Sequence, residues 1–435
     1  MSVDSGVWPH VTSATGTPGA EKVWMQTLPA WSQTGNHRVQ PLFLNCRAIA
    51  SSIGIGLDAT ARSLREMRSG LAECSFETAR LDTFVGQISD SLLAPVRTDL
   101  AEFDCRNNRI AQLCLRQDGF EQSVMAAREK YGAARIGVFL GTSTSGILET
   151  ELAYRRRDAG GALPADFRYA TTHNTYSVAW FVQSYFGLTG PSMAISTACS
   201  SSAKAFGSAA RMIAAGLCDA AVVGGVDSLC LTTLYGFGSL GLLSPVRCRP
   251  FDAERDGISI GEGGGMVLLE KTTDRAMADS IALLGVGESS DAYHMSTPHP
   301  EGLGARMAME RALVSAGLRP GAVDYVNLHG TGTRSNDATE DKAVCAVFGR
   351  DTPCSSTKGW TGHTLGACGA IDAIICALAI ERGFMPGSVN TRTIDPAMNL
   401  HYLLENRSGP LDVAMSNAFG FGGTNCSLLL GRMKS

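Results

Sequence analysis

The sequence predicts an α/β protein built from two similar halves. Short apolar runs typical of buried strands alternate with segments of helical spacing, as in sheets whose parallel strands are covered by helices. A strand leads into a small-residue helix start twice, at TACSSSAKA and at GACGAIDA, which indicates a duplication. The 435 residues are 44% hydrophobic, which is enough for a large core and longer than most single domains.

The first half is expected at residues 41–275. Residues 1–40 are rich in Ser, Thr, Gly and Pro without sustained periodicity, so we predict a loose N-terminal extension there. Ordered structure should begin near Pro41–Leu44, and Leu57 to Gly70 should form a helix closed by its glycine. The elements that follow are expected to be strands at 136–140, 193–196 and 220–223, and a helix at 200–215 that ends at Gly216.

The second half is expected at residues 276–435 and repeats this order. A helix at 305–316 should end at Gly317, and a strand should follow at 323–328. A further helix is predicted from apolar residues on one face, and a last strand at 427–430. The residues of that face are Cys368, Ile371, Ile375 and Leu378.

Composition excludes several classes of protein. A net charge of −4 does not suggest a nucleic-acid binder. The 13 cysteines show no CxxC pair and no paired-ligand spacing, which favours reduced thiols in a reducing compartment and predicts no metal site. No run of about 18 apolar residues and no secretory pattern occurs, so we expect no membrane span and, by default, a cytoplasmic protein.

Cys199 is the candidate nucleophile. It follows the strand at 193–196 and stands at or near the start of the next helix, where free N–H groups and the helix dipole favour a thiolate. Ala198 and Ser200–Ser202 are small, so a substrate can reach the sulfur, and an activated thiolate suits covalent acyl transfer. On local sequence alone, a buried structural cysteine is the commoner interpretation.

Two histidines and a lysine complete the candidate site. His329 follows a strand in LHGTGT, and His363 lies in STKGWTGHTLG. Gly- and Thr-rich turns of this kind let an imidazole approach a ligand closely, although each histidine alone would more often be structural. Because strand ends converge at one rim of a layered α/β protein, we expect both to meet Cys199. Two neutral imidazoles can stabilise a forming enolate, and Lys358 can add positive field or orient the network.

Together these motifs resemble the β-ketoacyl-[acyl-carrier-protein] synthases of the two-histidine, elongating type, in the thiolase-fold superfamily. The Cys-His-His set separates the chain from Cys-His-Asn initiating synthases and Cys-His-Cys thiolases. The resemblance implies a thiolase fold, with duplicated βαβαβαββ halves in α-β-α-β-α layers. The matching motifs stand in the family's order after about residue 41: TACSSSAKAFG (197–207), RPFDAERDG (249–257), GEGGGMVLLE (261–270), SSDAYHM (289–295), HGTGT (329–333), STKGWTGHTLGACGA (356–370) and SNAFGFGGTN (416–425).

The resemblance implies a decarboxylative condensation. Cys199 would take an acyl group from an acyl carrier protein, and the backbone N–H groups of Cys199 and Phe421 would form the oxyanion hole. His329 and His363 would bind the malonyl thioester carbonyl and promote decarboxylation. The carbanion would then attack the acyl-enzyme, giving a 3-oxoacyl thioester, CO2 and a free thiolate. No cofactor is implied, since the substrates carry the phosphopantetheine of the carrier protein.

The resemblance also assigns residues around this chemistry. Thr331 and Thr333 resemble the residues that contact the phosphopantetheine arm. Phe421 resembles a gating phenylalanine, and Gly420 and Gly422 would give its loop hinge freedom. Without the other motifs, this loop would be interpreted as a tight turn before the last strand. Three charged residues are expected to hold the fold rather than to react: Asp252, Arg255 and Asp256.

Two departures from the family pattern lie close to the site. Asp372 stands where the family usually has Glu, and the shorter carboxylate is expected to alter the network around Lys358 and His363. Trp360 is bulkier than the usual residue and is expected to reshape the site. Both departures bear on substrate range more than on reaction class.

The expected partners are an acyl carrier protein and a second subunit, giving a homodimer or a heterodimer with a ketosynthase-like chain. The carrier protein of this family is acidic, so basic residues outside the core are candidate contacts, although a solvated face explains each equally well. These candidates are Arg65, Arg68, Arg106 and Arg109.

Four functions remain open at this point. Two share the condensation chemistry: elongation in fatty acid biosynthesis, and elongation in a specialised polyene or polyketide pathway. The third is a non-catalytic partner subunit that determines chain length, against which Cys199 argues. The fourth is a thioester hydrolase or decarboxylase. A conspicuous acid or base beside Cys199 would favour it, and the sequence shows no such residue there.

Overall fold

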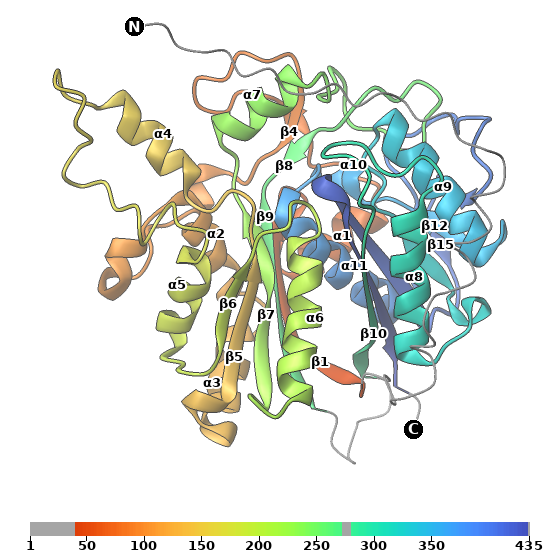
Figure 1. Ribbon diagram of the computed structural model, residues 1–435, viewed down its shortest axis with the longest axis horizontal. Helices are drawn as coiled ribbons and strands as arrows, with labels where there is room; N and C mark the ends of the chain where they lie inside the picture. The colour runs from red at the N-terminus through yellow and green to blue at the C-terminus, as the bar shows by residue number, and fades with distance from the viewer. Residues whose placement is uncertain (1–39, 272–279, 434–435) are drawn as a thin grey trace, which may run out of the picture. The chain divides into compact units, whose positions relative to one another are not determined.

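A single path of hydrogen-bonded strands runs through both halves of the chain (Figure 1). The computed structural model describes residues 40–271 and 280–433, so the extension expected at 1–40 lies almost wholly outside the described residues. The strands follow the order β14, β12, β11, β16, β17, β10, β1, β9, β7, β5 and β6, with the short β2 beside β1. Their bounds are β1 Leu42–Ser51, β2 Gly54–Ile55, β5 Ile136–Gly141, β6 Ser192–Ile195, β7 Ala220–Asp227, β9 Gly263–Lys271, β10 Ile281–Ser290, β11 Tyr325–Asn327, β12 Pro353–Ser355, β14 His401–Tyr402, β16 Val413–Gly420 and β17 Thr424–Arg432.

Each half of the sheet has the same strand order and the same strand directions. In the first half β6, β5 and β7 are parallel, and β9 and β1 follow with antiparallel pairings. In the second half β12, β11 and β16 are parallel, and β17 and β10 follow with antiparallel pairings. The halves meet where β1 pairs antiparallel with β10. With the helices between the strands, both halves read βαβαβαββ, which confirms the predicted duplication.

Helices form three layers around the two halves of the sheet. α6 (Ser201–Ala214) and α11 (Cys368–Arg382) lie between the halves, where their side chains share one core with β1, β9, β16 and β17. α11 is buried on every side from Cys368 to Ile380, as expected of a helix that is apolar all round. The outer layers are α2 (Arg106–Leu115), α3 (Phe120–Tyr131) and α5 (Ser177–Phe186) on the first half, and α8 (Leu303–Ala316) and α9 (Arg334–Phe348) on the second (Figure 1). The predicted α-β-α-β-α layering is therefore confirmed.

The helix predicted at 57–70 ends early. α1 covers Leu57–Arg65, and Met67 then takes a left-handed φ of 51°. Gly70 has a packing role instead: a Cβ there would lie 2.6 Å from the Ser52 carbonyl oxygen, and its N–H donates to the Trp360 carbonyl at 3.0 Å. The other elements are β3 Ala72–Glu73, β4 Phe84–Gly86, α4 Ile147–Arg155, α7 Leu231–Ser239, β8 Ile260–Gly261, α10 Lys358–Thr361, β13 Phe384–Met385 and β15 Arg407–Ser408.

Two of the three charges expected to hold the fold, Asp252 and Arg255, are buried and bonded, whereas Asp256 is exposed and accepts the Ser244 hydroxyl at 2.6 Å. The Arg255 guanidinium lies between Asp337 at 3.4 Å and Asp395 at 2.6 Å, and only 3% of its side chain is exposed. Asp252 accepts backbone N–H groups from Arg392 and other neighbours. The boundary between the halves at residues 275 and 276 falls outside the described residues and stays a prediction. No described helix is long and apolar enough to cross a membrane.

Candidate active site

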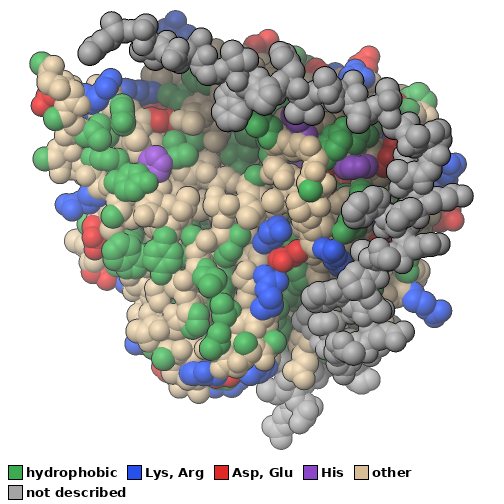
Figure 2. All heavy atoms as spheres, viewed as in Figure 1, with side chains coloured by type: hydrophobic (Ala, Val, Ile, Leu, Met, Phe, Trp, Pro, Cys, Tyr) green, Lys and Arg blue, Asp and Glu red, His purple; other side chains and the backbone are tan. Residues whose placement is uncertain are grey.

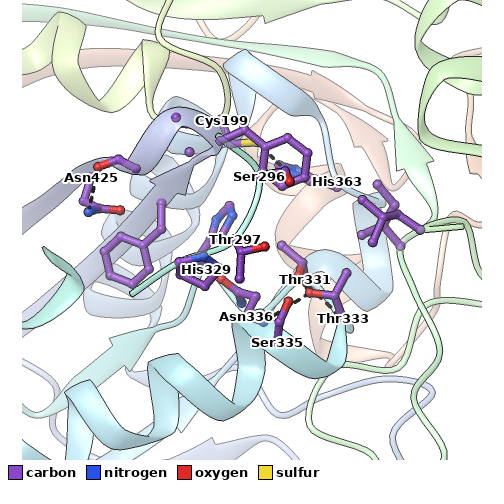
Figure 3. Close-up of a pocket in the computed structure, with 18 of the residues that line it drawn as sticks. Cys199, Ser296, Thr297, His329, Thr331, Thr333, Ser335, Asn336, His363 and Asn425 are labelled. Atoms are coloured by element: carbon purple, nitrogen blue, oxygen red, sulfur yellow. Dashed lines mark hydrogen bonds between the residues drawn. The ribbon is translucent and has the colours of Figure 1, made fainter. Parts of the chain in front are cut away.

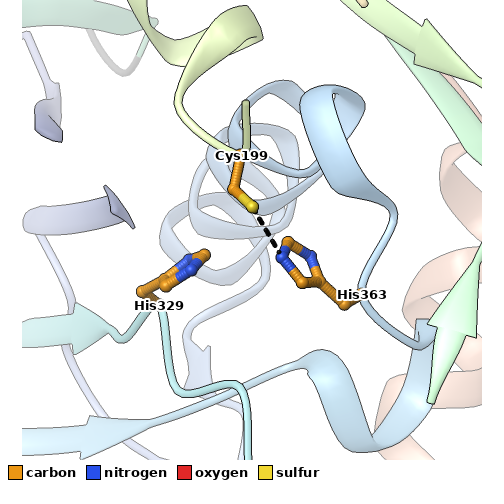
Figure 4. Close-up of side chains that lie close together, drawn as sticks. All are labelled: Cys199, His329 and His363. Atoms are coloured by element: carbon orange, nitrogen blue, oxygen red, sulfur yellow. Dashed lines mark hydrogen bonds between the residues drawn. The ribbon is translucent and has the colours of Figure 1, made fainter. Parts of the chain in front are cut away.

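Three chain segments bring Cys199, His329 and His363 together (Figure 4). Cys199 lies between β6 and α6, His329 follows β11, and His363 follows α10. The Cys199 Sγ lies 3.0 Å from the His363 Nε2, and the two imidazole ring centroids are 5.2 Å apart. Each residue offers an atom within 4.8 Å of the other two, and all three are buried. The structure therefore confirms that the sulfur of the first half meets both imidazoles of the second.

A strained turn presents Cys199 to this cluster. Ala198 has a left-handed φ of 52°, which an alanine rarely adopts. Its carbonyl accepts the Ser201 N–H at 3.1 Å, so the turn is fixed where α6 begins. Thr424 Oγ1 lies 2.9 Å from both the Ser200 hydroxyl and the Thr197 carbonyl oxygen, which ties this turn to the Phe421 loop.

The thiol of Cys199 is protonated at neutral pH in the resting site. Burial raises its pKa to about 11, although the Lys358 charge and the backbone N–H groups of Phe421 and Cys199 lower it. The backbone N–H groups favour the thiolate as expected, but burial outweighs them, so the net effect is opposite to the one predicted from the helix start. Cys199 precedes the first residue of α6 by two positions, and the partial charge of a helix end is weaker than the desolvation of a fully enclosed thiolate.

Both imidazoles are neutral at neutral pH. Burial, followed by the charge of Lys358, holds the pKa of His329 and of His363 well below its usual range. Lys358 itself stays charged, because the Asp372 carboxylate at 3.0 Å raises its pKa even though burial opposes the charge. Asp372 thus reaches Lys358 directly, and its other oxygen accepts the Thr357 hydroxyl at 2.7 Å.

A cavity of about 650 Å³, open at its mouth, leads to the cluster (Figure 3). Thr331 and Thr333 lie in its wall with their hydroxyl oxygens 3.0 Å apart. Phe421 lies at the mouth, 37% exposed, and its ring centroid is 5.8 Å from that of Phe237 in α7. Gly420 and Gly422 also line the cavity, and Gly422 has a left-handed φ of 79° that favours glycine.

Comparison with known proteins agrees with this arrangement. Residues 48–275 match the family model described as "Beta-ketoacyl synthase, N-terminal domain", and residues 281–392 match "Beta-ketoacyl synthase, C-terminal domain". The chain belongs to the β-ketoacyl synthase family. The 3-oxoacyl-[acyl-carrier-protein] synthase 2 of Vibrio cholerae is 31% identical over 88% of this synthase and 97% of its own length.

Two further relatives support this assignment. The mitochondrial 3-oxoacyl-[acyl-carrier-protein] synthase of Arabidopsis thaliana is 42% identical over 56% of this chain and 57% of its own length. Among solved structures, a chain from the complex of a ketosynthase with its chain length factor from Xenorhabdus doucetiae is 38% identical. That likeness has a TM-score of 0.83 and covers 91% of this synthase and 98% of the other chain.

Several residues that line or support the synthase cavity were not predicted from the sequence. Ser296, Thr297, Ser335 and Asn336 add polar groups to the wall (Figure 3). Glu340 lies behind His329 and accepts the backbone N–H groups of His329 and Gly330, each at 2.8 Å. Burial raises the pKa of Glu340 to about 7, against the effect of those N–H groups. An acid in the helix after HGTGT was the signal that could have indicated it.

Two expectations about the surroundings of the site are wrong. Arg106 is not a free surface cation: only 11% of its side chain is exposed, and it pairs with the buried Glu262 at 2.5 Å. Arg109 pairs with Asp104 at 2.7 Å but keeps 35% of its side chain exposed, so its candidacy stays a prediction, as do those of Arg65 and Arg68. Trp360 does not reshape the site, because it is fully buried in the central core and lies outside the cavity wall.

The donor atoms of the cluster do not suit a resident metal. Cys199, His329 and His363 offer a thiol and two imidazoles within 4.8 Å. Metal-bound histidines usually donate their second ring N–H to a partner, whereas the Nδ1 atoms of both histidines are buried without one. The buried Lys358 ammonium also disfavours a second cation at this place.

Proposed function

We propose that this synthase catalyses the decarboxylative Claisen condensation of an acyl thioester with malonyl-acyl carrier protein, giving a 3-oxoacyl-acyl carrier protein. The observation that carries the proposal is the contact of the Cys199 thiol with the buried, neutral His363 ring, with the equally buried and neutral His329 ring within 4.8 Å, at the end of an open cavity. The catalytic residues are Cys199, His329, His363 and Lys358.

The first half-reaction loads the enzyme. The proton of the Cys199 thiol passes to the neutral His363 Nε2, 3.0 Å away, as the sulfur attacks the acyl thioester. The backbone N–H groups of Cys199 and Phe421 both act on this sulfur, and they stabilise the oxyanion of the tetrahedral intermediate. The pantetheine thiolate leaves and takes up the proton, so Cys199 ends as an acyl thioester.

The second half-reaction forms the carbon–carbon bond. His329 donates an N–H bond to the malonyl thioester oxygen, and so does His363 in the tautomer that carries its single ring proton on Nε2. The electron pair released with CO2 becomes the enolate held by those bonds. Neutral imidazoles suit this role, because they donate a hydrogen bond without giving up a full proton. The enolate carbon attacks the acyl-Cys199 carbonyl, the C–S bond breaks, and the Cys199 thiolate takes up a proton from solvent.

The cavity wall and mouth fit a thioester on a carrier arm. Thr331 and Thr333 present adjacent hydroxyls to an amide-rich chain such as phosphopantetheine. Phe421 acts as the gate, with Gly420 and Gly422 as its hinge. The substrates bring phosphopantetheine with the carrier protein, so the reaction uses no separate cofactor. The alternative of a non-catalytic chain-length subunit is disfavoured by the intact Cys199–His363 contact.

A dimer is the proposed assembly. β6 is an edge strand of the sheet, paired only with β5 among the described strands, and an unpaired edge is a template for another chain. Exposed apolar side chains lie on this strand and at the adjacent α5: Met193 at 41%, Trp180 in α5 at 39%, and Tyr176 directly before α5 at 36%. Figure 2 shows hydrophobic side chains gathered on this face of the molecule. A second copy, or a ketosynthase-like subunit, would cover both features. All 13 cysteines are free, which fits the proposed reducing cytoplasm.

The test is to incubate the protein with a panel of acyl carrier-protein thioesters and follow acylation of Cys199 by mass spectrometry. Malonyl carrier protein is then added and 3-oxoacyl product is measured. Cys199→Ala should abolish both signals, whereas the matched control Cys74→Ser, at a half-buried cysteine outside the cavity wall, should retain them. The proposal fails if no thioester acylates Cys199, and release of free acid instead of condensation would indicate a hydrolase.

A further inference from the structure

A buried carboxylate that the proposed mechanism does not use lies at the end of β7. Asp227 is fully buried, and its Oδ1 accepts the Thr142 hydroxyl, the backbone N–H groups of Ser143 and Thr144, and the Thr144 hydroxyl, each at 2.8 Å. Its Oδ2 accepts the Gly366 N–H at 2.5 Å. Three of these donors are backbone N–H groups, which can only donate. The site is therefore built for the ionised carboxylate, although burial raises the pKa of Asp227.

These bonds join two segments that hold the reacting groups. The first is the loop 142–145 after β5, in which the Ser143 hydroxyl donates to the Ala198 carbonyl at 3.3 Å, directly before Cys199. The second is the turn at 365–367, which begins two residues after His363. We propose that Asp227 is a positioning residue of the active site, whose buried carboxylate ties the loop after β5 to the turn after His363 and so fixes Cys199 against the His363 ring.

The packing at Gly366 shows how closely the two segments meet. A Cβ on Gly366 would lie 2.6 Å from the Ser143 hydroxyl and 2.8 Å from the Asp227 Oδ2. Two residues later, the Cys368 thiol donates to the Cys199 carbonyl at 3.2 Å. The carbonyl groups before and after the Cys199 nitrogen are thus bonded by the loop after β5 and by Cys368, the first residue after the turn that Asp227 joins to that loop.

The charge of Asp227 has a second effect on the same sulfur. Among the groups that face Cys199, Lys358 lowers the pKa of the thiol and Asp227 raises it, while His329 and His363 are neutral. The neighbouring Cys368 thiol is protonated, since burial raises its pKa well above the usual value. Asp227 and Lys358 therefore act on the thiol in opposite directions, which gives the positioning role an observable that a purely structural role lacks.

The experiment measures alkylation of Cys199 by iodoacetamide between pH 7 and 9, together with condensation. The tryptic peptide 169–204 contains only this cysteine, so mass spectrometry reports on it alone. Below the thiol pKa the alkylation rate follows the thiolate fraction, and one pKa unit corresponds to a tenfold change. Asp227→Asn should raise the alkylation rate about threefold or more and lower the condensation rate about tenfold or more.

Two further variants separate the effect of the Asp227 charge on the thiol from the effect of its hydrogen-bond geometry. Thr142→Val removes one donor to Asp227 but keeps the carboxylate, so its alkylation rate should stay within about twofold of wild type. Asp227→Glu keeps the charge but displaces it, so the alkylation rate should change little while condensation falls. It also serves as the test if Asp227→Asn does not fold. The proposal is overturned if Asp227→Asn leaves the alkylation rate unchanged, if Thr142→Val raises it equally, or if Asp227→Glu condenses at the wild-type rate.

The inference rests on Cys199 as the nucleophile, but its readout does not depend on the substrate. Alkylation can be measured even if no carrier-protein thioester is turned over. If the Asp227 variants change alkylation as expected and wild type never condenses, the proposed function fails while the positioning role stands. If wild type condenses and the variants leave alkylation unchanged, the positioning role of Asp227 fails while the proposed function stands.

Discussion

The buried ion pair between Lys358 and Asp372 allows a quantitative test of the site. Their side chains are 1% and 2% exposed, and Nζ and Oδ2 are 3.0 Å apart. Replacing one partner leaves the other charge buried without compensation, which costs roughly 3–5 kcal/mol. We therefore expect Asp372→Asn and Lys358→Met each to lower the free energy of unfolding by about that amount. The double variant buries no charge at this place, so it should lose less than the sum of the singles by about 2 kcal/mol or more.

The assay is urea unfolding of the four proteins, followed by circular dichroism and combined as a double-mutant cycle. The same samples separate stability from chemistry. Lys358 lowers the pKa of the Cys199 thiol, so every variant without it should be alkylated more slowly at pH 8, and the double variant should not recover. Single variants that lose less than about 1 kcal/mol, or losses that simply add, would refute the reasoning that the pair is buried and coupled.

Three further outcomes are expected. His329→Ala should lower decarboxylation of malonyl carrier protein about 100-fold while acylation of Cys199 persists, because one enolate donor is lost; loss of acylation alone would contradict the assignment. Both imidazoles have a depressed pKa, so the condensation rate should not fall as the pH drops through 6.5 because of histidine protonation. Glu340 has a pKa raised to about 7, so the rate is also measured in Glu340→Gln; a fall near pH 6.5 that persists in this variant would be evidence against neutral histidines. Met193→Asp should shift the protein from dimer to monomer in light scattering, whereas an unchanged mass would exclude the β6 edge as the interface.

Strand ends explain why much of the site could be predicted from the sequence. Cys199 and His329 each follow a short apolar run, and strand ends of a layered α/β protein meet at one rim. The turn motifs around His363 and Phe421 are long enough to indicate their places without contact information. The duplicated order of strands and helices could likewise be predicted from alternating patterns alone.

Burial and distant partners could not be predicted in the same way. The high pKa of Cys199 arises from enclosure by segments of both halves, which a local helix-start argument does not include. Arg106 resembled a surface cation because its partner Glu262 lies 156 positions away in the sequence. Asp227 was overlooked for a similar reason, because its donors come from residues 142–144 and from Gly366.

The central place of β1 sets a condition on how the chain is made. β1 leaves the ribosome early, but its neighbours in the sheet are β9 at residues 263–271 and β10 at residues 281–290. At about 5–20 residues per second, the strand waits roughly 10–45 s for those partners. During that time only the last two residues of this 10-residue, largely apolar strand can pair locally, with β2, so most of both edges stays unpaired and translation exposes an aggregation-prone strand. The synthase should therefore depend on chaperone capacity during expression, more than a fold built from local contacts would.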